Sequence, residues 1–212
     1  MIRAVTFDLW GTLVWNSGVY DTTLQSKRID LIYSTLEGEI SREIIGEAMR
    51  KSWVEIESIR STLRDVPTSE QLRIVQKFLN TTIDLEKPYT EAVFSFPPTL
   101  NPCTKNVLKS LTTKIGLISN TGRTPGKVLR TVLAQMGISA YFDATIFSNE
   151  VGYLKPHPEI FRKASELLGI PLSEILHVGD DSTCDVEGAR AVGMQALHIK
   201  ELTDLEKVLE LV

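Results

Sequence analysis

Polar side chains stand in this sequence directly after two runs of apolar residues. Asp8 follows the run 2–7, and Ser119 and Asn120 follow the run 114–118. A carboxylate in such a position can serve as a nucleophile, while a hydroxyl and an amide can hold the oxygens of an anion. The carboxyl ends of parallel strands share one rim of a sheet, where ligands bind. We therefore expect these residues to meet at one rim.

Further charged side chains follow later runs of the same kind. Asp180 and Asp181 come after the run 175–178, Asp185 stands a few residues further on, and Lys155 lies in a loop after another short apolar run. Clustered carboxylates repel one another and raise each other's pKa values. Mg²⁺ relieves that repulsion because it takes oxygen ligands and retains sites for water or phosphate oxygens.

The combined set predicts a metal-assisted reaction at phosphorus. Asp8, Asp180 or Asp181, and a backbone carbonyl are the expected protein ligands of Mg²⁺. Ser119 and nearby backbone N–H groups would hold phosphate oxygens, and Lys155 would balance the remaining negative charge. Asp8 is then the nucleophile.

Short apolar runs alternate with helical patterns around these residues. The alternation favours an α/β fold, with a parallel sheet covered by helices on both faces. The expected strands are 2–7, 114–118, 145–147, 175–178 and 196–199, and the expected helices are 105–111, 127–136, 159–168, 186–191 and 202–209.

A long helical stretch separates the first expected strand from the others. Apolar residues recur at helical spacing through roughly 19–80, and no strand pattern of similar clarity interrupts them. An isolated first strand could not pair by itself, so it belongs with the later strands. The helical segment is therefore predicted to be an insertion, with crossings near 15–17 and 94–98.

Composition excludes several classes of protein and partner. The 212 residues include 23 Lys and Arg against 27 Asp and Glu, a formal net charge of −4. We expect no nucleic-acid or membrane partner, because no global basic field is present and no apolar stretch approaches membrane-spanning length. Cys103 and Cys184 are the two cysteines, without metal-binding spacing, so the expected compartment is a reducing cytoplasm.

Four segments in order resemble the motifs of the haloacid dehalogenase superfamily of hydrolases. They are FDLWGTLV at 7–14, ISN at 118–120, LKPHP at 154–158, and VGDD at 178–181 with Asp185. The resemblance implies a Rossmann-like, doubly wound parallel core formed by residues 1–15 and 98–212. It also implies a helical cap formed by residues 16–97, and a small-molecule substrate.

The resemblance also implies roles for individual residues. Asp8, Lys155 and Ser119 are the expected catalytic residues. The expected substrate-binding residues are Ser119, Asn120 and Thr12, and the expected Mg²⁺ ligands are Asp8, the Trp10 backbone carbonyl, Asp180 and Asp181.

Trp10 departs from the pattern of the superfamily's phosphatases. These usually carry a second Asp two residues after the nucleophile, which protonates the leaving group and activates water. Loss of a positioned general acid–base typically costs about 100- to 10,000-fold in rate. The superfamily's dehalogenases lack that Asp, are metal-independent, and are expected to bind halide through a cap arginine. Arg28, Arg42, Arg60 and Arg64 are available for that role.

The acidic fourth motif outweighs Trp10, since three Asp within six residues are costly without a cation. The leading prediction is a Mg²⁺-dependent phosphohydrolase that forms an aspartyl-phosphate on substrates with good leaving groups, such as aryl or acyl phosphates. A metal-independent 2-haloacid dehalogenase with the same nucleophile is the first alternative. A non-catalytic binding or regulatory module is the second.

Overall fold

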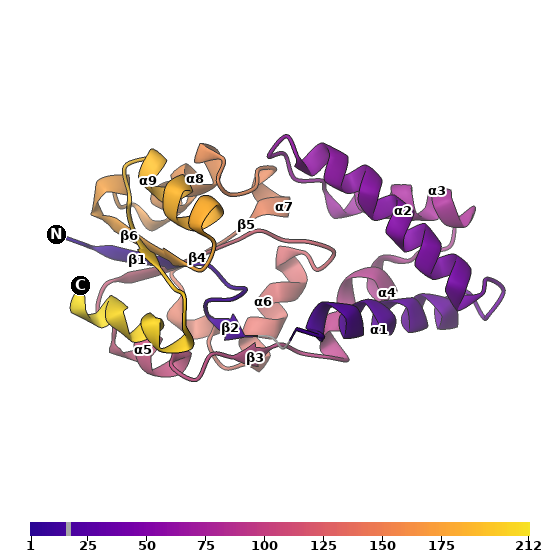
Figure 1. The fold of residues 1–212 in the computed structure, drawn as a ribbon, viewed down its shortest axis with the longest axis horizontal. Coiled ribbons are helices and arrows are strands. Elements are labelled where there is room, and N and C mark those ends of the chain that lie inside the picture. Colours follow the sequence, from indigo (N-terminus) through magenta and orange to yellow (C-terminus); the bar gives the residue numbers. More distant parts are fainter. Residues whose placement is uncertain (16–17) are drawn as a thin grey trace.

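A five-stranded parallel sheet forms the centre of the core. The computed structural model describes residues 1–15 and 18–212. The strands are β1 (Ala4–Phe7), β4 (Lys114–Ser119), β5 (Ala144–Phe147), β6 (Ile175–Gly179) and β7 (Gln195–His198), in the order β5-β4-β1-β6-β7 (Figure 1). Strand β1 pairs in parallel with both β4 and β6. The predicted α/β fold with a parallel sheet is confirmed.

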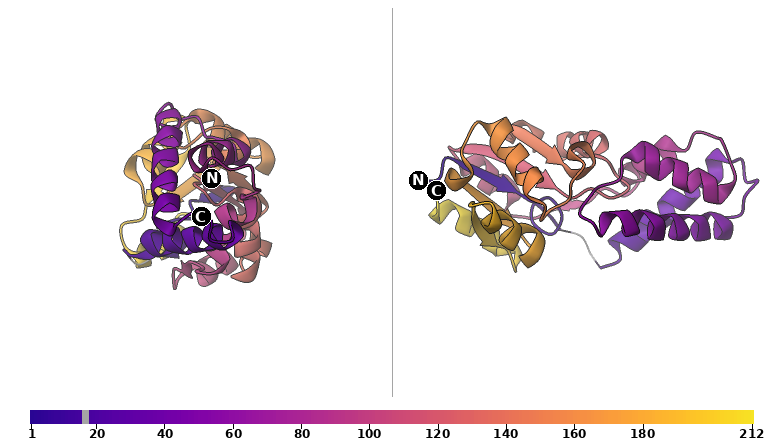
Figure 2. Two further views of the ribbon diagram at one scale, coloured as in Figure 1. Left: turned by 90° about the vertical axis from the view of Figure 1, so that its right-hand side faces the viewer. Right: turned by 90° about the horizontal axis from the view of Figure 1, so that it is seen from above.

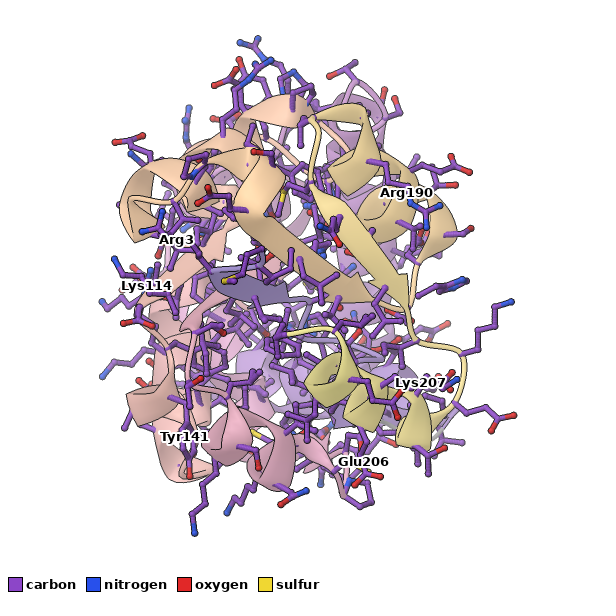
Figure 3. All side chains as sticks on the ribbon, turned by 90° about the vertical axis from the view of Figure 1, so that its left-hand side faces the viewer. Arg3, Lys114, Tyr141, Arg190, Glu206 and Lys207 are labelled. Carbon is purple, nitrogen blue, oxygen red and sulfur yellow. The ribbon has the colours of Figure 1, made fainter. Side chains whose placement is uncertain are left out.

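Helices cover both faces of this sheet. Successive strand residues point to opposite faces, and apolar side chains on each face pack against helices. Val5 and Phe7 pack against one apolar cluster, and Ala4 packs against another. The first cluster involves α5 (Thr104–Ser110), α6 (Gly126–Gln135) and η5 (Leu202–Glu210), and the second involves α8 (Pro158–Leu168) and α9 (Gly188–Ala191). Figure 3 shows Glu206 and Lys207 on one side of the sheet and Arg190 on the other.

The inserted segment folds into a group of helices at one end of the molecule, here called the cap (Figures 1 and 2). Its helices are α1 (Tyr20–Thr35), α2 (Arg42–Arg60), α3 (Thr68–Leu79), α4 (Glu86–Thr90) and the 3₁₀ helix η1 (Glu91–Phe94). They enclose a separate apolar cluster that includes Ile32, Met49 and Val75. No helix in the described residues is long and apolar enough to cross a membrane.

Two short strands carry the chain between core and cap. Strands β2 (Val14–Trp15) and β3 (Thr99–Leu100) pair antiparallel, with Val14 opposite Leu100 and Trp15 opposite Thr99. The cap boundaries predicted from sequence, 15/16 and 97/98, lie beside these strands. Asn16 and Ser17, at the first boundary, lie outside the described residues.

A second connection joins the cap loop that follows α2 to the core. The backbone N–H of Asp65 donates to the Gly152 carbonyl at 3.0 Å, and that of Leu154 donates to the Leu63 carbonyl at 2.9 Å. The buried Asp65 carboxylate accepts from the core hydroxyls of Thr121 at 3.1 Å and Ser148 at 2.5 Å. The cap is therefore fastened to the loop that carries Lys155.

Candidate active site

Asp8 lies immediately beyond β1 and is 5% exposed. Its Oδ1 accepts from the Nζ of Lys155 at 2.5 Å, and the same ammonium donates to Oδ1 of Asp185 at 2.6 Å. All three side chains are buried. A buried lysine held between two carboxylates stays charged and fixes their positions.

Asn120 positions the lysine through the backbone. Its Oδ1 accepts from the Lys155 N–H at 2.7 Å, and its Nδ2 donates to the Lys155 carbonyl at 3.1 Å. The sequence predicted that Asn120 would bind substrate. In the structure both ends of its amide are bonded to the Lys155 backbone, although the residue also lines the cleft described below.

Three carboxylates converge at this point. Oxygens of Asp8, Asp180 and Asp185 all lie within 4.8 Å of one another. The Asp180 carboxylate lies over Gly11, where an added Cβ would stand 2.2 Å from its Oδ2. A set of oxygen donors with this spacing suits a hard divalent cation such as Mg²⁺. Three carboxylates and one ammonium leave two negative charges, which such an ion would neutralise.

Asp181 and Asp185 occupy different places in the structure: Asp181 caps a helix, and Asp185 belongs to the carboxylate cluster. Asp181 was an expected metal ligand, but its Oδ1 accepts from the backbone N–H groups of Thr183 at 2.8 Å and Cys184 at 2.7 Å. It thereby caps the π-helix Ser182–Glu187. Asp185 takes the place expected for Asp181 in the carboxylate cluster, because the first turn of this helix returns it to the end of β6.

A buried chain of polar groups supports Asp185. Its Oδ1 lies 3.1 Å from Nε2 of His177, and Nδ1 of that ring lies 2.9 Å from the Thr6 hydroxyl. Burial lowers the pKa of His177, so the ring is neutral at pH 7. Thr6 and His177 project from neighbouring strands, and sequence patterns placed neither of them at the site.

Burial dominates the electrostatics of the cluster. It raises the pKa of Asp8 from 3.8 to about 7, against the opposing effect of Lys155. Burial also raises the pKa of Asp180, with Asp185 adding to the effect. Burial disfavours the Lys155 ammonium, but Asp8 and Asp185 overcome this and raise its pKa. A divalent cation would reverse the shift at Asp8 by stabilising its carboxylate.

Three further predicted residues lie around the nucleophile. Ser119 ends β4 and is fully buried, with its hydroxyl 3.5 Å from the Asn120 carbonyl. Thr12 is also buried, and no described residue bonds to its hydroxyl. Trp10 turns its ring toward the cap, 6.2 Å from the ring of Tyr20. The Trp10 side chain thus packs between core and cap.

A cleft of about 760 Å³ lies between cap and core beside these residues. Trp10 and Asn120 contribute from the core, and Trp53 contributes from α2. Arg28 and Arg123 also line it. Arg28 is one of the four cap arginines that the sequence offered as anion ligands, whereas Arg123 was not predicted at the site. Only the position of Arg123, three residues after Asn120, pointed to the site.

A family model described as haloacid dehalogenase-like hydrolase matches residues 2–193. The chain belongs to this family. Its members are hydrolases, so the expected enzyme class is confirmed.

Individual relatives of this hydrolase include phosphatases. The mouse haloacid dehalogenase-like hydrolase domain-containing protein 3 is 31% identical over 73% of this chain, and the match spans 57% of that protein's length. A glyceraldehyde 3-phosphate phosphatase from Methanopyrus kandleri is 26% identical, over 94% of this chain and 84% of its own. The crystal structure of a HAD phosphatase from Thermococcus onnurineus superposes with a TM-score of 0.67 at 25% identity, covering 98% of both chains.

Proposed function

We propose that this hydrolase is a Mg²⁺-dependent phosphohydrolase that acts on a small phosphorylated metabolite through an aspartyl-phosphate at Asp8. The observation that carries the proposal is the carboxylate cluster of Asp8, Asp180 and Asp185, in which Lys155 pairs with the buried carboxylates of Asp8 and Asp185. A 2-haloacid reaction needs one carboxylate nucleophile, whereas three carboxylates beside one ammonium leave a net charge of −2, which suits a divalent cation.

The chain's own residues supply the nucleophile and its orientation. Asp8 is held by Lys155 with one carboxylate oxygen engaged, which leaves the other free to attack phosphorus in line with the leaving group. Lys155 also neutralises charge on the transferring group. When bound, Mg²⁺ would be held by Asp8, Asp180, Asp185 and the Trp10 carbonyl, and would supply Lewis-acid stabilisation of the phosphoryl oxygens.

Trp10 limits the class of leaving group. Its indole has no acid–base capacity at neutral pH, so an alkoxide would have to depart without a proton from this position. Aryl and acyl phosphates do not need that proton, because phenolates and carboxylates are stable leaving groups. We therefore propose a preference for substrates of these two types.

The test is hydrolysis of p-nitrophenyl phosphate with Mg²⁺ and with EDTA, in the wild type and in Asp8→Asn. We expect phosphate release that EDTA abolishes and that Asp8→Asn reduces by several orders of magnitude, with the circular dichroism spectrum unchanged. Turnover retained by Asp8→Asn would refute the assignment of the nucleophile. An unchanged circular dichroism spectrum would show that Asp8→Asn loses activity because the nucleophile is missing and not because the protein unfolds.

One observation favours a second candidate, a 2-haloacid dehalogenase. Trp10 stands where the superfamily's phosphatases carry their acid–base, and halide leaves carbon without a proton. L-2-chloropropionate provides the discriminating assay. Chloride release that is indifferent to EDTA would favour dehalogenation over the phosphohydrolase, and its absence alongside Mg²⁺-dependent phosphate release would reject it.

A further inference from the structure

Two arginines in the cleft lack an acidic partner. Arg28 comes from α1 of the cap and Arg123 from the loop after β4 of the core, and both line the same cleft. Within the described residues, neither has a carboxylate within salt-bridge distance. The other two arginines of the cleft do: Arg50 pairs with a glutamate of its own helix, and Arg60 pairs with Asp65.

The hydrogen bonds of Arg28 do not compensate its charge, and Asp21, which also lines the cleft, stands beyond salt-bridge distance. The side chain is buried, its Nε donates to the Tyr89 carbonyl at 2.6 Å, and its Nη1 donates to Oε1 of Gln25 at 3.2 Å. Both acceptors are neutral. Burial lowers the pKa of Arg28 to about 10, and repulsion from Arg123 adds to the shift. Both guanidinium groups belong to side chains that line the one cleft.

Arg123 is partly buried, less so than Arg28. Its guanidinium lies 4.0 Å from the centre of the Trp53 ring, and its Nε is enclosed with no described residue as hydrogen-bond partner. Burial lowers its pKa as well. A buried donor without a partner costs free energy, and so does a buried charge without a counter-charge. An anion placed between the two arginines would remove both costs.

The cleft extends from these arginines to Trp10 and Asn120, the near neighbours of Asp8 and Ser119 in sequence. On the basis of the phosphohydrolase function proposed above, we propose that the substrate carries a carboxylate at the end remote from its phosphate, and that Arg28 and Arg123 bind this carboxylate. Guanidinium groups bind carboxylates through paired N–H donors. Trp10 and Trp53 provide apolar walls for the body of the substrate between its two anionic ends.

The placement of the two arginines couples recognition to closure of the cap. One belongs to the cap and the other to the core, so a carboxylate bound by both holds the two parts together over Asp8. A substrate without the carboxylate loses this bridge. Arg28 and Arg123 thus act as specificity-determining residues that select the substrate and the closed arrangement together.

The test compares two non-hydrolysable ligands, benzylphosphonate and 4-carboxybenzylphosphonate, by isothermal titration calorimetry with Mg²⁺. They differ only in the carboxylate. We expect the wild type to bind the carboxylated ligand about 10- to 100-fold more tightly, as charge-assisted hydrogen bonds predict. Arg123→Gln and Arg28→Gln should each reduce this ratio to about 3-fold or less. Arg28→Lys serves as a second variant at the buried position, should Arg28→Gln fail to fold, and is expected to retain part of the preference.

Arg73→Gln is the matched control, because Arg73 lies exposed on α3 and pairs with Glu70 away from the cleft. It should keep the full ratio. Equal affinity of the wild type for the two ligands, no binding of either, or a ratio that Arg123→Gln leaves intact would each overturn the proposal. Mg²⁺-dependent turnover of p-nitrophenyl phosphate, which has no carboxylate, tests the phosphohydrolase function separately. A flat ratio with such turnover rejects only the carboxylate site.

Discussion

Asp185 and Asp181 offer a sharp comparison, because the same substitution at positions four residues apart should differ in its cost to stability and in its effect on Mg²⁺ binding. The Asp185 carboxylate accepts from Lys155 at 2.6 Å, from the His177 ring at 3.1 Å and from the Asp181 N–H at 3.1 Å. Breaking a buried ion pair costs about 3–5 kcal/mol. Lys155 keeps Asp8 as a partner, so we expect Asp185→Ala to lower the free energy of unfolding by about 3 kcal/mol, the lower end of that range.

Asp181→Ala removes a helix cap and nothing from the carboxylate cluster. Two backbone N–H groups, those of Thr183 and Cys184, lose their acceptor. Removing such a cap costs about 1 kcal/mol. We expect the variant to be slightly less stable than the wild type, and to keep its response to Mg²⁺ and most of its activity.

The assay is urea unfolding with and without Mg²⁺, followed by circular dichroism. At a concentration of 100 times the dissociation constant, Mg²⁺ stabilises a folded protein by about 2.7 kcal/mol. The wild type and Asp181→Ala should both gain that amount, whereas Asp185→Ala should gain little at the same concentration. If Asp181→Ala lost the Mg²⁺ response and Asp185→Ala kept it, the assignment of the cluster to Asp185 would be refuted.

Three further outcomes follow from the same contacts. Trp10→Asp should raise hydrolysis of alkyl phosphates such as glycerol phosphate by about 100-fold, if only the acid–base is missing; no gain in kcat/KM would show that the cleft is adapted to other substrates. Asp65→Ala should lower the urea-unfolding free energy by about 3–5 kcal/mol, since Arg60 and two core hydroxyls lose their buried partner; a change under about 1 kcal/mol would contradict the role of Asp65 in fastening the cap. In EDTA, the raised pKa of Asp8 means that the folded protein retains a proton which the unfolded chain releases. The contribution of Asp8 to the free energy of unfolding is fully present below about pH 4 and is lost as the pH rises through about 7, by up to about 4 kcal/mol. Asp8→Asn should flatten this part of the plot of unfolding free energy against pH. An unchanged plot would be evidence against the raised pKa of Asp8.

The order of the elements and the residues at the strand ends could be predicted from the sequence. Apolar runs and helical periodicity depend on neighbouring residues along the chain, so they predicted all five core strands and the helical insertion. The meeting of Asp8 with Lys155 followed from the same reasoning, because parallel strands bring their carboxyl ends to one rim. The superfamily motifs predicted a hydrolase, and the matching family model confirms that class.

The choice between neighbouring acids required the tertiary structure. The sequence predicted Asp181, and not Asp185, as a metal ligand. The π-helix turns Asp185 back onto Gly179, where an added Cβ would stand 2.2 Å from its carboxyl carbon. Only this close approach, which no local pattern encodes, brings Asp185 into the cluster.

The cleft was also decided by tertiary packing alone. Arg28 and Arg123 are 95 residues apart in the chain; the sequence did not single out Arg28 among the cap arginines and did not predict that Arg123 lines the same cleft. Asp65 of the cap bonds to Thr121 and Ser148 of the core, and both arginines line the cleft between the two parts. The sequence by itself therefore predicted which polar groups gather at the strand ends, because local patterns position them there. Packing between distant segments determined which acids form the cluster and which side chains line the cleft.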